Sequence, residues 1–152
     1  MRIELVENAS PELLEAVQMH LREYNRAANP DWYAARSFSE PLPLQLFAFA
    51  ESGAPLGGLL AETQFLWLKI SILVVLPDFR RQGLGQQLMQ KAESIALARG
   101  CRLAYLDTME YQAPRFYEKL GYSVVGRLDN WDSHGHAKLF MTKELSQQAL
   151  DR

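Results

Sequence analysis

The segment Leu73–Gly85 constrains the fold of this chain more than any other part of its 152 residues. An apolar run ends at a proline, the chain turns through Arg80 and Arg81, and a helical pattern begins at Gly83 and Gly85. The first amides of a helix have no partners inside the helix and carry partial positive charge. Glycines let a phosphate approach those amides closely, and the two arginines add charged donors. The segment therefore predicts a buried strand, a phosphate-binding turn and a long helix in succession.

The same residues exclude two better-known phosphate loops. A Walker loop requires Gly-Lys followed by Ser or Thr, and the sequence contains no such tripeptide. The dinucleotide-binding fingerprint requires a third glycine shortly after Gly85, at the position where this chain has Leu88. The turn therefore belongs to a different class of phosphate site.

The rest of the chain alternates between helical and extended patterns. Apolar residues spaced three and four apart, with a capping Ser10 and with glycines after the periodic stretches, indicate helices. Runs rich in β-branched and aromatic residues indicate strands. Helices are expected at about 11–26, 31–36, 83–99 and 114–120, and strands around 3–5 and at 42–50, 56–64, 66–76, 102–107, 122–126 and 137–142. This order predicts one mixed-sheet α/β domain over residues 1–152, with a parallel strand pair on either side of the helix at 83–99.

Composition excludes several broad classes of protein. With 48% hydrophobic and 22% charged residues the chain buries a core, and a net charge of -2 argues against a dedicated nucleic-acid binder. Apolar runs such as Ile72–Leu76 are far shorter than the roughly 18 residues of a membrane helix. Acidic residues near the start do not fit a signal peptide, and Cys101 is the only cysteine. A cytoplasmic location is therefore expected.

The charges are divided unevenly along the chain. Residues 1–76 carry 5 basic and 9 acidic side chains, whereas residues 77–152 carry 11 basic and 9 acidic ones. An asymmetry of this size also arises by chance in ordinary domains. The alternative to chance is a functional one, in which the second half of the chain binds an anion and the first half contacts a cation.

The hexapeptide Arg80–Gly85 resembles the Arg/Gln-x-x-Gly-x-Gly/Ala signature of the GNAT N-acetyltransferases. The helix at 83–99, the strand Leu103–Asp107 and the segment Ala113–Tyr122 stand in the family's order and spacing, and the resemblance is clear from about residue 66 to 126. It implies the GNAT fold, a single domain with a mixed, mostly antiparallel central sheet of six or seven strands flanked by helices. In that fold one parallel strand pair splays apart.

The resemblance also implies a reaction and its site residues. In the family an amine attacks the thioester carbonyl of acetyl-CoA directly, and CoA leaves as a thiolate. Backbone groups of Leu73 and Val75 would bind the developing oxyanion and the pantetheine arm. Tyr117 aligns with the tyrosine that protonates the leaving sulfur, since ordinary pKa values of about 10 for a phenol and about 8.5 for a thiol are close. The residues expected to bind the cofactor pyrophosphate are Arg80, Arg81, Gln82, Gly83, Leu84, Gly85 and Gln86.

The residue that deprotonates the amine is left open. Lys69 stands where histone-modifying members have a glutamate, which counts against a histone-type mechanism. Glu62, His20 and Asp107 are candidates for the base, and a chain of waters is another. Glu110 stands where many members have an asparagine, so its role is open between a pantetheine contact and a contact to the acceptor amine.

The expected acceptor is a primary amine of a small molecule or a peptide, and neither a nucleic acid nor a membrane is an expected partner. No metal is expected, because His134 and His136 beside Asp132 more often mean a polar hairpin loop than a metal site. Homodimers are common in the family. Two alternatives remain, namely another acyl donor or an oxygen acceptor on the same fold, and a GNAT-like module that senses acyl-CoA without turnover. The intact Tyr117 favours catalysis.

Overall fold

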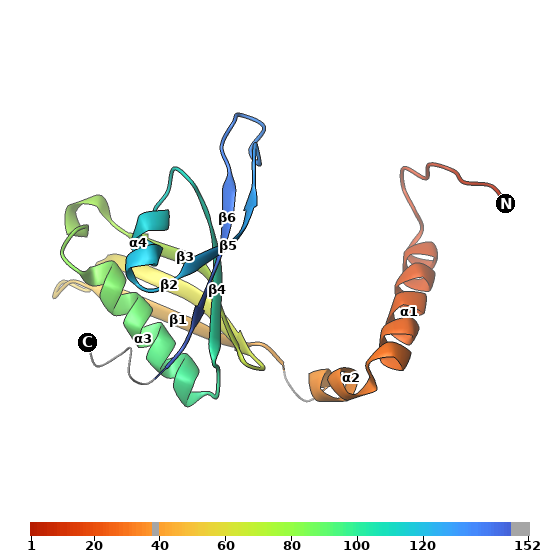
Figure 1. Cartoon of the computed structure of the whole chain (residues 1–152), viewed down its shortest axis with the longest axis horizontal. Coiled ribbons are helices and arrows are strands. Elements are labelled where there is room, and N and C mark those ends of the chain that lie inside the picture. The colour runs from red at the N-terminus through yellow and green to blue at the C-terminus, as the bar shows by residue number, and fades with distance from the viewer. Residues whose placement is uncertain (38–39, 147–152) are drawn as a thin grey trace. The chain divides into compact units, whose positions relative to one another are not determined.

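The computed structural model describes residues 1–37 and 40–146 and divides into two compact units, Met1–Glu40 and Pro41–Arg152. Each unit is described by itself. Figure 1 shows the helices of the first unit, and the sheet with its covering helices in the second. Within the described residues, no helix combines the length and the apolar character needed to cross a membrane.

The first unit contains two consecutive helices, α1 (Pro11–Ala28) and α2 (Pro30–Ser37). The Ser10 hydroxyl accepts a hydrogen bond of 3.3 Å from the amide of Leu13, which caps α1 as its sequence predicts. Both helices expected in this region are confirmed. The strand expected around residues 3–5 is wrong, since residues 1–6 have no regular structure. An alternating pattern makes a strand only where a second strand supplies hydrogen bonds, and here none of the described strands pairs with it.

The second unit is built on a mixed sheet. Its described strands are β1 (Leu42–Phe49), β2 (Pro55–Gln64), β3 (Trp67–Val75), β4 (Leu103–Met109), β5 (Ser123–Leu128) and β6 (Lys138–Glu144), in the spatial order β1-β2-β3-β4-β6-β5. The pair β3–β4 is parallel and every other neighbouring pair is antiparallel. The predicted α/β class, with one parallel pair in a mostly antiparallel sheet, is confirmed.

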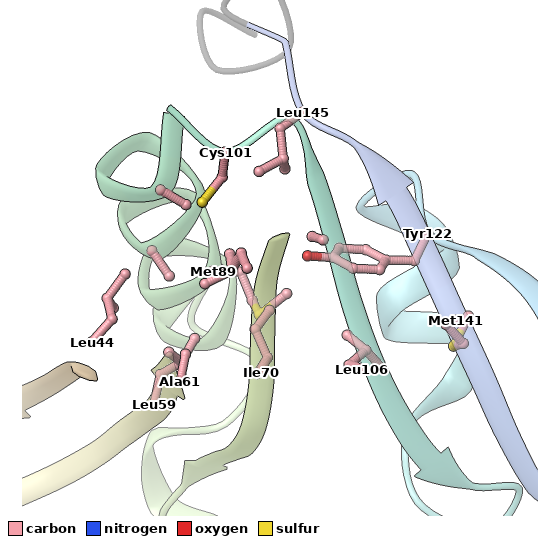
Figure 2. Packing of buried hydrophobic residues seen from close by; sticks show 14 of the residues in the cluster. Leu44, Leu59, Ala61, Ile70, Met89, Cys101, Leu106, Tyr122, Met141 and Leu145 are labelled. Atoms are coloured by element: carbon pink, nitrogen blue, oxygen red, sulfur yellow. The ribbon is translucent and has the colours of Figure 1, made fainter. Parts of the chain in front are cut away.

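Helix α3 (Leu84–Ala98) connects the parallel pair and packs on the sheet. The core lies between them and includes Leu59, Leu68, Met89, Leu106 and Met141, each at most 1% exposed. Figure 2 shows core side chains from several adjacent strands lying on the face of the sheet that carries α3. Burying such side chains contributes roughly 1.5–3 kcal/mol each. This layer fixes the helix that starts at the glycine turn.

The parallel strands separate before they end. Residue pairing between β3 and β4 runs from Trp67–Leu103 to Ile70–Leu106 and then stops, although β3 continues to Val75 and β4 to Met109. The β2–β3 pairing has a register shift between Leu60 and Ala61, opposite Ile72 and Ile70, where the β3–β4 pairing ends. The sheet therefore opens between β3 and β4 at the end that leads into the glycine turn.

Candidate active site

The turn after β3 has the geometry that its sequence indicates. A single 3-10 turn, η1 (Pro77–Phe79), follows the strand, and Gly83 occupies the capping position of α3 with φ of 82°. Only glycine adopts this left-handed conformation without strain. The side-chain amide of Gln82 donates a hydrogen bond of 2.9 Å to the carbonyl of Asp78 and closes the loop. The first amides of α3 are thus presented at the end of the opened sheet.

Arg80 is tied to the strand it follows. Its Nε donates a hydrogen bond of 2.9 Å to the carbonyl oxygen of Val75, the last residue of β3. One donor of the guanidinium therefore fixes the strand end, while the others remain for a second partner. Arg81 has a positive φ of 60°, whereas the backbone of Arg80 is extended. The two neighbouring arginines therefore differ in backbone conformation.

A cleft of about 800 Å³ lies between the glycine turn, the end of β3 and helix α4 (Pro114–Lys119), and we call it the α3–α4 cleft. This volume is within the range of small-molecule sites. Of the cofactor-binding residues and the proton donor that the GNAT resemblance implies, all but Gln82 line it. They are Leu73, Val75, Arg80, Arg81, Gly83, Leu84, Gly85, Gln86 and Tyr117. Residues up to 44 positions apart in the sequence therefore share one concave surface.

Gly85 is explained by packing against α4. A Cβ atom added at Gly85 would lie 3.3 Å from Cζ of Phe116 and 3.7 Å from Cγ2 of Val75. The absence of a side chain thus lets α4 approach the first turn of α3. This contact brings Tyr117, the next residue of α4, to the same cleft.

Tyr117 is held between two aromatic rings. Its ring centroid lies 5.1 Å from that of Phe116 and 6.1 Å from that of Tyr122, both in edge-to-face geometry. Burial raises the pKa of the Tyr117 phenol above its usual value of 10.0. The hydroxyl therefore stays protonated at neutral pH and is available as a proton donor.

Two basic residues of the cleft were not predicted from the sequence. Arg115 and Lys119 stand four residues apart on α4, which is the spacing of one helix face, and both line the cleft. Phe79, Gln112, Ala113 and Phe116 complete the lining. The four-residue spacing of these two basic residues on a predicted helix was the sequence signal that could have identified them.

Each residue considered as a base has an ion-pair partner. Glu62 lies 3.4 Å from Nζ of Lys69, and His20 lies 3.5 Å from Glu23 within α1. Asp107 pairs with Lys138 at 2.8 Å. Within the second unit, neither Glu62 nor Asp107 is among the residues that line the α3–α4 cleft.

Glu110 anchors the start of β6. Its Oε1 accepts a hydrogen bond of 3.0 Å from the amide of Ala137, and its Oε2 accepts one of 3.0 Å from Arg127. The Ala137 amide and the guanidinium of Arg127 hold the pKa of this carboxyl below its usual value. The side chain thus joins β4, β5 and β6 at one point.

Among the residues that the structure describes, no three His, Cys, Asp or Glu side chains form a group suited to a metal ion. Asp132 and His136 instead form a close pair within the β5–β6 loop, with Oδ2 and Nδ1 2.6 Å apart. Cys101, the only cysteine, is buried, and burial raises the pKa of its thiol.

Comparison with known proteins identifies the family. A family model described as the acetyltransferase (GNAT) family matches residues 9–122, which is most of the chain and includes the whole α3–α4 cleft lining. The chain belongs to the GNAT acetyltransferases. The family match extends over both compact units.

Relatives and solved structures agree with this GNAT assignment. The chain is 33% identical over 110 residues to blasticidin-S acetyltransferase of Streptomyces morookaense, which covers 70% of this chain and 80% of the relative. The crystal structure of an acetyltransferase from Bacillus cereus ATCC 14579 has 32% identity and a TM-score of 0.76, covering 93% of this chain and 98% of that one. A candidate streptothricin acetyltransferase from Bacillus anthracis, solved with acetyl coenzyme A, shares the fold at 18% identity and a TM-score of 0.63. That match covers 69% of this chain and 64% of the other.

Proposed function

We propose that this GNAT protein transfers an acetyl group from acetyl-CoA to a primary amine of a small molecule by direct attack of the amine on the thioester. We further propose that residues 1–152 act as one acetyltransferase domain. The observation that carries the proposal is that the glycine turn, its two arginines and a partly buried tyrosine, Tyr117, line one cleft.

The phosphate end of the cleft suits a polyanion. The first amides of α3 point along the helix axis, and Gly83 leaves the approach to them open. Arg80 and Arg81 would pair with the pyrophosphate of acetyl-CoA, each charged hydrogen bond contributing about 1.5–3 kcal/mol. Arg115 and Lys119 on α4 would neutralise further phosphate charge.

The reacting end requires three contacts. The backbone of Val75 would hold the pantetheine arm where β3 has lost its neighbour β4, and the amide of Leu73 would stabilise the oxyanion. The amine nitrogen forms a bond to the carbonyl carbon, the carbon–sulfur bond breaks, and the Tyr117 phenol gives its proton to the departing sulfur. This chemistry requires no metal.

The class of acceptor is inferred from relatives and charge. One relative is named for acetylation of blasticidin-S, which favours a small-molecule amine over a protein. The first half of the chain carries more acidic than basic residues, and this fits a cationic acceptor.

The test is thiol release from acetyl-CoA in the presence of blasticidin S, polyamines, amino acids and short peptides, with mass spectrometry of the products. Release that depends on a small amine, with a product heavier by one acetyl group, supports the proposal. Release with peptides alone would show that the acceptor is a peptide amine rather than a small-molecule amine. No release with any acceptor, together with tight CoA binding, would indicate a sensor of acyl-CoA.

The arginines offer a separate check on the cleft. CoA should raise the melting temperature of the chain, and the Arg80→Ala/Arg81→Ala double variant should lose most of this shift. Added salt should reduce the shift of the wild type, because phosphate pairing is screened.

A further inference from the structure

The β5–β6 loop contains a carboxylate–imidazole pair that lies outside the α3–α4 cleft lining. Oδ2 of Asp132 lies 2.6 Å from Nδ1 of His136, a distance typical of a charge-assisted hydrogen bond. Oδ1 of the same carboxylate accepts hydrogen bonds from the amides of His134 at 2.9 Å and His136 at 3.1 Å. With Nδ1 donating to Asp132, neutral His136 presents Nε2 as an acceptor. In the described part of the chain, Nε2 of His136 has no hydrogen-bond partner.

The loop holds this pair rigidly. The amide of Gly135 donates to Oδ1 of Asn130 at 2.8 Å, and the amide of Trp131 donates to the carbonyl of His136 at 2.8 Å. Asn130, Ser133 and Gly135 all have positive φ, as a tightly folded loop requires. The orientation of His136 is thus set by several bonds rather than by solvent.

The pair lies beside the turn that leads from β4 into the cleft. The His136 ring meets the Tyr111 ring edge to face, with centroids 5.0 Å apart. The next residue, Ala137, exchanges two hydrogen bonds with Glu110, one through the backbone at 2.9 Å and one through the carboxylate at 3.0 Å. Gln112, which follows Tyr111 directly, lines the α3–α4 cleft. In Figure 1 the β5–β6 hairpin extends at the end of the sheet where β4 runs into the turn before α4.

We propose that His136, oriented by Asp132, is the base that removes a proton from the acceptor amine. The inference rests on the proposed function. Nε2 of neutral His136 takes a proton from the acceptor ammonium, whose freed lone pair then bonds to the thioester carbonyl carbon as the carbon–sulfur bond breaks. Tyr117 protonates the sulfur, the newly acylated nitrogen gives up its surplus proton through solvent to the Tyr117 phenolate, and His136 releases its proton to solvent. The sum is one amide, one CoA thiol and one proton.

The charged groups around His136 are Asp132 on its own loop, Glu110 after β4 and, paired with Glu110, Arg127 on β5. Tyr111 supplies the ring contact. The Asp132–His136 pair is arranged like the carboxylate and histidine of a catalytic triad, in which the carboxylate fixes the tautomer of the histidine. Asp132 would orient the imidazole and His136 would accept the proton, so variants of the two residues test two different roles.

The experiment measures kcat and KM between pH 5.5 and 9.5 for the wild type and the variants His136→Ala, Asp132→Asn and His134→Gln, with the best amine of the acceptor panel. His136→Ala should lose at least about a hundredfold in kcat across this pH range. Added imidazole should restore part of the rate to His136→Ala.

Asp132→Asn should lower kcat by about tenfold or more with little change in KM for acetyl-CoA, and His134→Gln should stay within about twofold of wild type. CoA should raise the melting temperature of every variant that is folded and keeps the CoA site. A variant that shows this increase but has a low kcat has therefore lost the base rather than the fold. A His136→Ala variant that keeps the wild-type rate and pH profile would overturn the inference while leaving the proposed function intact. A wild type that acetylates no amine would overturn both.

Discussion

The hydroxyl of Tyr122 donates a hydrogen bond of 3.0 Å to the carboxylate of Glu93. Both residues are buried, and Nζ of Lys143 lies 2.6 Å from the second oxygen of that carboxylate. Burial and the neighbouring carboxylate raise the pKa of the Tyr122 phenol. In Figure 2 the Tyr122 hydroxyl points into the core on the side of the sheet that carries α3. Since the Tyr122 ring also contacts Tyr117, the middle of α3 supports the proposed proton donor.

We expect Tyr122→Phe to lose about 1.5–3 kcal/mol of stability, because a buried hydrogen bond to a charged group disappears while the ring remains. Urea denaturation measures the change in midpoint. The ring contact to Tyr117 persists, so KM for acetyl-CoA should change little. A midpoint equal to that of the wild type would show that the bond contributes nothing net.

Lys143→Met should be more damaging, at about 3–5 kcal/mol, because it leaves Glu93 as an uncompensated buried carboxylate. The double variant Lys143→Met/Glu93→Gln should recover a substantial part of this loss. The same urea titration reports both variants. Equal stability of the single and double variants would contradict the charge explanation.

Tyr117→Phe should lower kcat well over tenfold while KM for acetyl-CoA stays nearly constant, since the ring packing is preserved and only the proton donor is removed. Because burial raises the pKa of the Tyr117 phenol, ionisation of this group should not reduce wild-type activity until the pH exceeds about 10. Steady-state kinetics across pH tests both statements. An unchanged kcat in the variant would remove Tyr117 from the mechanism.

Gly83→Ala and Gly100→Ala form a matched pair. Both glycines have positive φ, 82° and 91°, and a Cβ at either position meets nothing closer than 3.8 Å. Each substitution should cost about 1–2 kcal/mol of stability for left-handed backbone strain. Only Gly83 lies in the α3–α4 cleft, so only Gly83→Ala should also weaken CoA binding, as measured by calorimetry. Equal CoA affinity in the two variants would argue against phosphate binding at this turn.

Glu110→Gln should change how stability depends on pH. The pKa of Glu110 is lowered in the folded chain, so its contribution is present above the ordinary carboxyl pKa of about 4.3 and is lost as pH falls below it. The variant should melt lower than wild type at pH 7, and the gap should narrow as the pH falls below the ordinary carboxyl range and through the lowered pKa of Glu110. Circular dichroism melting curves provide the measurement. Glu118→Gln, at an exposed helix position, should follow the wild type throughout.

Local patterns in the sequence were enough to predict much of the fold. The glycine turn, the long helix after it and the parallel pair followed from short-range rules, and so did the Ser10 cap. The strand around residues 3–5 was wrong because its formation depends on a distant partner strand rather than on its own alternation.

Long-range side-chain pairs were beyond sequence reasoning. Glu93 meets Tyr122 and Lys143 across 29 and 50 residues, and no local spacing indicates such a contact. The β5–β6 loop was expected only as a polar hairpin, since hydrogen bonds within a loop depend on its backbone conformation. All of the site residues taken from the GNAT resemblance except Gln82 line one cleft, whereas the roles given to them await the experiments above.

The short pairing between β3 and β4 also divides the sheet mechanically. On one side lie β1, β2 and β3, joined by long antiparallel ladders, and on the other lie β4, β6 and β5. Within the described sheet, the stretch from Trp67–Leu103 to Ile70–Leu106 is the shortest strand pairing, and the amides of Arg102 and Leu103 extend it with hydrogen bonds to the carbonyl of Leu66. We therefore expect this seam to be the weakest line in the sheet. A load that pulls the halves apart would open the chain along the same line at which the acetyl donor is proposed to lie.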